Sequence, residues 1–129
     1  MPSQPASDEL GDLLRRVGPE VAGLVRATDE LIRRTDPDVV AVYWPHQRTA
    51  GYGVGPKKMS EHYAYIAVYD RHLNLGCNYG ARLDDGGLLE GTGKSMRKLT
   101  VRDRATLDDP RLVPLLRSAR QERLDALGR

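Results

Sequence analysis

Two neighbouring segments in the middle of the chain, residues 62–69 and 72–79, constrain the fold more than any other stretch. Both are rich in aromatic and aliphatic residues, as β-strands are, and only Asp70 and Arg71 separate them. Two such segments joined by two residues predict an antiparallel hairpin. The short loop also fixes the cross-strand pairs, which are Tyr69–His72, Ala67–Asn74, Tyr65–Gly76 and Tyr63–Asn78.

Side chains alternate between the two faces of a strand, so the hairpin predicts two surfaces of different character. One face is aliphatic and should join the core, with His62 and Tyr79 at its end; it carries Ala64, Ile66, Val68, Leu73, Leu75 and Cys77. The opposite face, which we call the outer face, carries Tyr63, Tyr65, Tyr69, His72, Asn74 and Asn78. Because tyrosine favours positions where the ring is buried and the hydroxyl is wet, we interpret the outer face as a ligand groove or as a dimer contact.

Helical periodicity is found at both ends of the chain. After Ser7, which can cap a helix, apolar residues recur at spacings of three and four, and a second such stripe runs from Pro19 to about Arg34. A third stripe follows Asp109 and stops at Gly128, and glycine commonly terminates helices. The sequence therefore predicts two N-terminal helices and one C-terminal helix.

Short segments rich in β-branched and aromatic residues predict three more strands, at residues 39–44, 49–54 and 96–101. Glycines interrupt the second of these, which indicates a β-bulge or the close approach of another backbone. Consecutive strands with helices at the ends are typical of an α+β domain. We therefore predict an antiparallel β-sheet of about five strands with the helices on one face.

The length of 129 residues fits one domain. Residues 1–6 are rich in proline and serine and are predicted to form a disordered N-terminus, which leaves residues 7–129 as a single domain. No apolar run is long enough to span a membrane, the first residues do not resemble a signal peptide, and one cysteine requires no oxidising compartment, so we expect a cytoplasmic protein. The net charge of +2 argues against a nucleic-acid partner.

Two glycine-rich stretches of the chain are each followed by cations. The first precedes Lys57 and Lys58, and the second precedes Lys94 and Arg97. The second stretch ends like a phosphate-binding loop but lacks its first glycine and is followed by strand residues, which argues against nucleoside-triphosphate hydrolysis. Its backbone N–H groups could still hold an anion, or its glycines could serve only to shape a tight loop. We hypothesise that the four cations form one basic rim.

Residues that ligate metals are scattered along the chain. Cys77 is predicted on the core face and His72 on the outer face, so we expect no zinc site. Iron held by surface carboxylates would draw on the acids of the first two helices, which are Asp8, Glu9, Asp12, Glu20, Asp29 and Glu30. Arginines interleave with these acids, which favours a salt-bridged helix surface instead. No set of serine, cysteine and histidine typical of nucleophilic catalysis stands out, which favours a function without catalysis.

Four motifs within residues 51–98 carry a family resemblance: YGVGPKKMSEHYAYIA, HLNLG, YGARLDD and GLLEGTGKSMRK. In these motifs the chain resembles the YdhG-like family, catalogued as domain of unknown function 1801. The resemblance implies a small α+β domain, and some members of the wider group have been likened to frataxin-type iron chaperones. This chain departs from the family pattern at Cys77, Asp85 and Lys98. Because Lys98 stands where histidine is common, a metal role for that position is not expected here.

Three functions follow from these observations. We favour a non-enzymatic domain that binds a small polar or anionic ligand on the outer face and the basic rim, through Lys57, Lys58, Tyr63, Tyr65, His72, Asn74, Lys94 and Arg97. The first alternative is a frataxin-like iron chaperone that uses surface carboxylates. The second is an interaction module that forms a homodimer through the sheet. No resident cofactor is predicted, and iron enters only through the chaperone alternative.

Overall fold

The computed structural model describes residues 3–129 of the chain, with the side chains from residue 9 onward. Five strands form one antiparallel sheet in which neighbours follow the chain order. They are β1 Val40–Trp44, β2 Thr49–Gly53, β3 His62–Val68, β4 Leu73–Cys77 and β5 Arg97–Val101. The helices are α1 Ser3–Leu14, α2 Pro19–Thr35, α3 Lys58–Glu61 and α4 Leu112–Ala126, and short 3-10 turns span Pro45–Gln47, Gly80–Arg82 and Arg104–Asp108.

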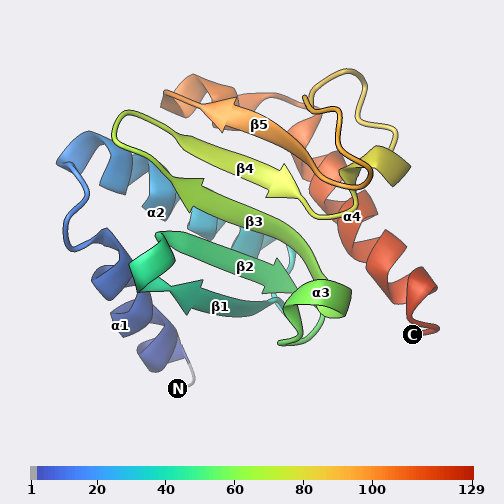
Figure 1. Ribbon diagram of the computed structural model, residues 1–129, viewed down its shortest axis with the longest axis horizontal. Helices are drawn as coiled ribbons and strands as arrows, with labels where there is room; N and C mark the ends of the chain where they lie inside the picture. Colours follow the sequence, from blue (N-terminus) through green and yellow to red (C-terminus); the bar gives the residue numbers. More distant parts are fainter. Residues whose placement is uncertain (1–2) are drawn as a thin grey trace.

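The long helices cover one face of the sheet. In Figure 1, α2 and α4 lie behind the sheet and contact its central strands, while α1 packs against β1. The opposite face is turned toward the viewer, and none of the long helices of residues 3–129 crosses it. We keep the name outer face for this open surface and call the covered one the inner face. The arrangement confirms the predicted α+β class, with a five-stranded antiparallel sheet.

The three long helices form where apolar periodicity predicts them, with shifted starts. α1 begins at Ser3 rather than at Ser7, so residues 3–6 of the segment predicted as disordered are helical. Residues 1 and 2 of that segment lie outside the described residues. α2 begins at Pro19, as expected for a residue whose fixed backbone angle suits a first helical turn. α4 begins at Leu112, and Asp109 accepts a hydrogen bond from the backbone just before it. None of the helices among the described residues is long and apolar enough to cross a membrane.

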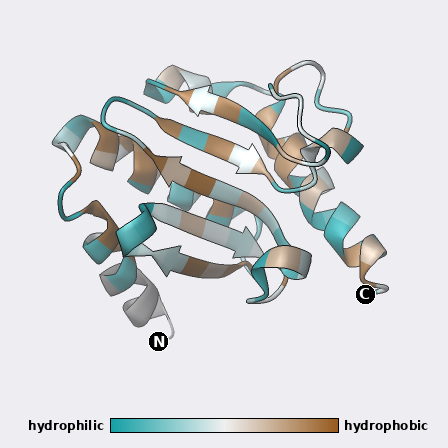
Figure 2. Cartoon of the chain, viewed as in Figure 1, coloured by the Kyte–Doolittle hydropathy of each residue, from teal (hydrophilic) through white to brown (hydrophobic). Residues whose placement is uncertain are grey.

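β3 and β4 pair in the predicted register. Tyr65 lies opposite Gly76 and Ile66 lies opposite Leu75, as the two-residue loop requires. Ile66 and Leu75 are buried under the helices, so the aliphatic side of the hairpin is the inner face. Hydrophobic and hydrophilic bands alternate along β4 (Figure 2). The predicted division of the hairpin into a core face and an open face is therefore correct at its centre.

A β-bulge at the start of β3 breaks the alternation at one end of the hairpin. Gly53 pairs with His62, whereas the adjacent Tyr52 pairs with Ala64, so Tyr63 is the extra residue of the bulge. A Cβ on Gly53 would collide with the backbone of Glu61 and His62, where α3 leads into β3, which explains why glycine occupies this position. The glycine-rich β2 thus contains both the irregular pairing and the close backbone approach that its sequence indicates.

The bulge corrects the predicted positions of two side chains. Tyr63, predicted on the outer face, is buried on the inner face, where its hydroxyl donates to Asp36 Oδ2 at 2.7 Å. His62, predicted at the end of the core face, lies on the outer face against Gly51 and Trp44. Strict alternation predicts the reverse because it does not count the extra residue. Tyr63 is therefore removed from the set of side chains that face an outer ligand.

A buried carboxylate on α2 fixes that helix to the sheet. Asp29 Oδ1 accepts hydrogen bonds from the hydroxyls of Tyr43 and Tyr52, both at 2.6 Å, and Oδ2 accepts from Arg33 Nε at 2.9 Å. Burial and the hydrogen bond to Asp29 raise the pKa of Tyr43 to about 12, so its hydroxyl keeps its proton. Asp29, grouped by sequence with the surface acids, is in fact buried.

Replacing Asp29 by alanine should lower the free energy of unfolding by about 3 kcal/mol, because three donors would lose their shared buried acceptor. The neighbouring Glu30 provides a matched control, since its exposed side chain pairs with exposed Arg34. Urea denaturation of Asp29→Ala and Glu30→Ala measures the difference, and Glu30→Ala should change stability little. Equal effects of the two substitutions would contradict the anchoring role of Asp29.

Candidate functional site

A cavity of about 200 Å³ opens on the outer face of the sheet. Its lining comes from β1 to β3, from α3 and from the segments that flank β4 and β5. The lining residues are Trp44, Gln47, Thr49, Ala50, Gly51, Lys58, His62, Tyr65, Ala67, Asn78 and Met96. Aromatic rings and small residues thus share one hollow on the side of the sheet that the long helices leave open.

Two glycines give the rings of the cavity their place on the sheet. A Cβ on Gly51 would collide with the imidazole of His62, and a Cβ on Gly76 would collide with the phenol ring of Tyr65. Both rings therefore occupy the space beside a glycine of the neighbouring strand that a side chain would otherwise fill. The two glycines thus make room for the rings that line the cavity.

Trp44 and Lys58 complete one wall of the cavity. The Trp44 ring centroid lies 5.9 Å from that of His62, and Lys58 Nζ lies 5.1 Å from the Trp44 ring centroid. The second distance is within the range of a cation–π interaction. A positive charge and an indole ring therefore stand together at the edge of the cavity.

The C-terminal helix holds α3, and with it Lys58, against the end of the sheet. Arg123 Nη1 donates to the backbone oxygen of Ser60 at 3.0 Å, and Arg129 Nη1 lies 2.8 Å from Glu61 Oε2. These contacts span more than sixty residues of sequence. A helix as short as α3 has little stability of its own, so its position depends on them.

Three residues of the cavity lining carry buried polar atoms without hydrogen-bond partners. Among the buried side-chain nitrogen and oxygen atoms that the structure describes, four lack a partner, and three of these are Thr49 Oγ1, His62 Nε2 and Asn78 Oδ1. The fourth, Arg120 Nε, belongs to α4 and lies 3.2 Å from Asp36 Oδ2. Each unpaired buried polar group costs about 1–3 kcal/mol, so such groups are uncommon in folded proteins.

Two ionisable side chains of the cavity, His62 and Tyr65, keep their neutral forms near neutral pH. Burial lowers the pKa of His62, and the charge of Lys58 lowers it further. Burial raises the pKa of Tyr65, so its hydroxyl stays protonated. Cys77 lies on the inner face, where burial raises the pKa of its thiol to about 12 and opposes thiolate chemistry. The cavity is thus suited to hydrogen bonding and ring stacking.

The structure brings two of the eight predicted ligand residues into the cavity lining, Lys58 and Tyr65. His72 and Asn74 belong to the outer face of the hairpin but lie outside the lining of the cavity. The His72 ring stacks on that of Tyr69, with centroids 4.8 Å apart, and Asn74 Oδ1 accepts a hydrogen bond from the neighbouring strand. Both side chains therefore already have interaction partners within the protein.

The predicted basic rim does not form as one unit. Arg97 pairs with Cys77 across the strands and so shares the inner face with it, and its guanidinium donates to the backbone oxygen of Gly93 at 2.6 Å. Lys57 and Lys94 are exposed and lie outside the cavity lining. Of the four cations, Lys58 is the one in the lining, and the inclusion of Arg97 in an outer rim is wrong.

The sequence reasoning missed most of the lining, for identifiable reasons. Trp44 and Thr49 belong to β1 and β2. No local sequence pattern reveals that these two strands lie beside the hairpin in the sheet. His62 reaches the outer face because of the bulge. The glycines of β2 are the one feature of the sequence that indicates this bulge. Asn78 follows from strand alternation, which places it on the outer face beside Tyr65.

Comparison with known proteins adds no assignment to this site. No protein-family model, curated protein or solved structure matches the chain. The resemblance to the YdhG-like family stays a prediction. Among the side chains from residue 9 onward, no group of three or more His, Cys, Asp or Glu residues is placed to hold a metal ion. The function has to be argued from the cavity itself.

The lowered pKa of His62 predicts a loss of stability in mild acid. Below the ordinary histidine pKa of about 6.5, the unfolded chain binds a proton that the folded chain excludes, so the free energy of unfolding falls as pH decreases toward the folded pKa. His62→Gln should make stability less dependent on pH between 7.5 and 5.5, as measured by urea denaturation at both pH values. His46→Gln, which alters an exposed side chain, should keep the wild-type dependence. An unchanged dependence in His62→Gln would contradict the assignment.

Proposed function

We propose that this chain is a YdhG-like α+β domain that binds a small polar or anionic ligand in the outer-face cavity and catalyses no reaction. One observation carries the proposal: Thr49, His62 and Asn78 all line the same cavity, and each has a buried polar atom without a hydrogen-bond partner. A ligand that hydrogen-bonds to these atoms would recover the free energy that they cost the unliganded protein. Functional sites commonly keep such locally unfavourable groups.

The size and walls of the cavity favour a ligand with one planar ring. A volume of about 200 Å³ is smaller than the cavities of about 300–1,000 Å³ that hold drug-sized molecules. The rings of Trp44, His62 and Tyr65 offer faces for stacking, and the unpaired atoms offer both donor and acceptor positions at the edges. Lys58 at the mouth favours a carboxylate or another anionic group on the ring.

The protonation of the site supports binding rather than catalysis. General acid–base catalysis favours groups that gain and lose protons near neutral pH. The pKa of Tyr65 is raised and that of His62 is lowered, so both move away from this range. Lys58 stands at the edge of the cavity beside Trp44 and can attract an anion without forming a bond to it.

Dimerisation through the sheet is the second candidate, and the open outer face favours it. Met96 lines the cavity with half of its surface exposed, and Met59 of α3 is 82% exposed. Exposed apolar side chains beside an uncovered face are typical of protein contacts. The iron-chaperone alternative draws support from the family resemblance. Two of its candidate carboxylates do not favour it, because Asp29 is buried and Glu30 pairs with Arg34.

The single tryptophan of the chain provides the assay, because Trp44 is part of the lining. Benzoate, nicotinate and uracil are suitable probes, as each has one planar ring with polar edges. We expect at least one of them to change Trp44 fluorescence in a saturable manner and to raise the melting temperature. A melting temperature that rises with protein concentration alone supports the dimer, and one that rises with Fe(II) alone supports the iron chaperone. Either result contradicts the proposal.

Thr49→Val should weaken binding of the probe about tenfold, because the nearly isosteric valine lacks the unpaired hydroxyl that the ligand would engage. The same change should leave the melting temperature of the unliganded protein unchanged or higher, because an unsatisfied buried hydroxyl is removed. Fluorescence titration and thermal melting measure the two effects.

Thr100→Val is the matched control, because Thr100 lies on the same face and bonds to Asn74 outside the cavity. It should not affect binding of the probe. If Thr49→Val destabilises the protein and leaves the affinity unchanged, the hydroxyl has a structural role and the proposed ligand contact does not exist.

A further inference from the structure

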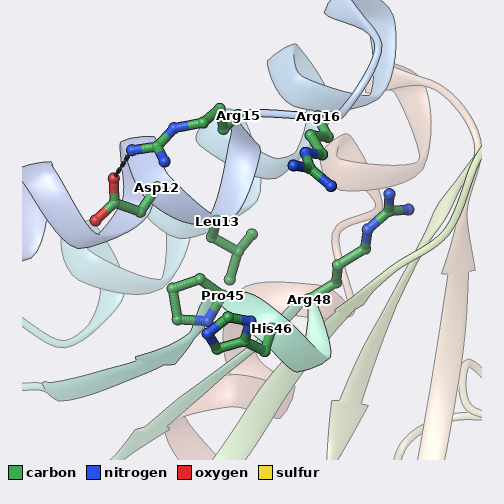
Figure 3. A pocket seen from close by; sticks show the side chains of 7 residues that line it. All are labelled: Asp12, Leu13, Arg15, Arg16, Pro45, His46 and Arg48. Carbon is green, nitrogen blue, oxygen red and sulfur yellow. Dashed lines mark hydrogen bonds and ion pairs between the residues drawn. The ribbon is translucent and has the colours of Figure 1, made fainter.

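A second and larger cleft lies between α1 and the 3-10 turn Pro45–Gln47 (Figure 3). Its volume is about 640 Å³, and its lining shares no residue with the outer-face cavity. The lining residues are Asp12, Leu13, Arg15, Arg16, Pro45, His46 and Arg48. Three arginines and a histidine thus line one cleft together with a single carboxylate.

The three arginines of the cleft differ in what they contact. Arg15 turns away from the cleft to an ion pair with Asp12, so the one carboxylate of the lining is occupied. In Figure 3, the guanidinium groups of Arg16 and Arg48 point toward one another at one end of the cleft, and the His46 ring lies below them. Arg16 makes no ion pair with any side chain from residue 9 onward. Two guanidinium groups therefore share one end of the cleft, and the single carboxylate of the lining is paired with Arg15.

The backbone of Arg48 is in an unfavourable conformation. Its φ of 54° lies in the left-handed region, and within residues 3–129 it is the one non-glycine residue with a positive φ. Glycine adopts this conformation without cost, and asparagine or aspartate tolerates it, whereas arginine has no short polar group that would help. The backbone therefore gives no reason for an arginine here.

The ion pair of Arg48 does not explain why an arginine occupies this position either. Arg48 Nη1 lies 3.6 Å from Asp70 Oδ1, and the Asp70 side chain is 94% exposed. An ion pair this long and this exposed contributes little to stability. Residues other than glycine in a strained conformation are common at functional sites, where the contacts of the side chain offset the strain.

We propose that this cleft binds a phosphomonoester of small-molecule size, with its phosphate held between Arg16 and Arg48. A guanidinium group presents donors in a planar fork that matches two oxygens of a phosphate, and two such groups can neutralise a dianion. His46 adds a further donor to the lining, while Leu13 and Pro45 give it an apolar side. The cleft exceeds the size of inorganic phosphate, so it has room for the rest of a phosphorylated metabolite. The chain's net charge of +2 disfavours a nucleic acid as the source of that phosphate.

Glycerol 3-phosphate and inorganic phosphate are the probes, because neither has a ring that would enter the outer-face cavity. Isothermal titration calorimetry should show saturable binding of both, with glycerol 3-phosphate the tighter ligand. Saturable binding of a single-stranded oligonucleotide, with none of glycerol 3-phosphate, overturns the assignment to a small molecule. Absence of saturable binding of both probes at millimolar concentration overturns the site.

Arg48→Gly separates the ligand role of this residue from its structural role. Glycine relieves the backbone strain, so the melting temperature should stay the same or rise. Affinity for glycerol 3-phosphate should fall about tenfold or more, because one of the two guanidinium groups is lost. Arg16→Ala should produce a loss of similar size without involving the strained position.

Arg26→Ala is the control for general charge, because Arg26 is an exposed arginine of α2 outside the cleft. It should leave the affinity unchanged. Equal losses in Arg26→Ala and Arg48→Gly would show attraction by net charge alone and would overturn the proposal. A marked drop in the melting temperature of Arg48→Gly, with affinity retained, would assign Arg48 a structural role and would overturn it as well.

Discussion

Hydrogen bonds from three tyrosine hydroxyls to two carboxylates, one on α2 and one at its C-terminal end, decide which face of the sheet is covered. Asp29 accepts from Tyr43 and Tyr52, and Asp36, just beyond α2, accepts from Tyr63. Buried carboxylates are costly unless they are hydrogen-bonded, so α2 cannot shift along the sheet without losing these partners. Because the three tyrosines point toward α2, the helix is held on the inner face and the opposite face stays open. The outer-face cavity is therefore a consequence of how the inner face is secured.

The bulge at Tyr63 couples the two faces of the sheet. One extra residue lets Tyr63 turn inward to Asp36 while its neighbour His62 turns outward onto Gly51. A regular strand would place the two side chains the other way round, with a tyrosine on the glycine and an imidazole facing the carboxylate. The same irregularity thus supplies an anchor for the core and an unpaired nitrogen for the cavity. Bulges often redirect a side chain in this manner near functional sites.

Sequence reasoning succeeded where the rules are local and failed where distant residues decide. The hairpin register follows from a two-residue loop, so Ile66 and Leu75 were assigned to the core correctly. Tyr63 was misplaced because its partner Asp36 is 27 residues away, and nothing near Tyr63 in the sequence signals the bond. Most of the cavity lining was missed for the same reason, since it combines strands whose order only the folded sheet defines. The rim hypothesis combined the cations of two glycine-rich stretches without regard to the sheet face of each, and Arg97 shares the inner face with Cys77.

Two unfavourable features of this structure are adjacent in one turn. Along the chain, Pro45–Gln47 leads into strained Arg48 and then into Thr49, whose hydroxyl has no partner. The left-handed residue reverses the chain between β1 and β2, so its neighbours line different hollows: His46 faces the larger cleft and Gln47 the outer-face cavity. A sequence selected for stability alone would place glycine at position 48 and valine at position 49, because both changes remove a cost without breaking a described contact of the core. The two retained polar residues therefore point to selection for what the side chains bind, and the turn is the part of the fold where that selection acts.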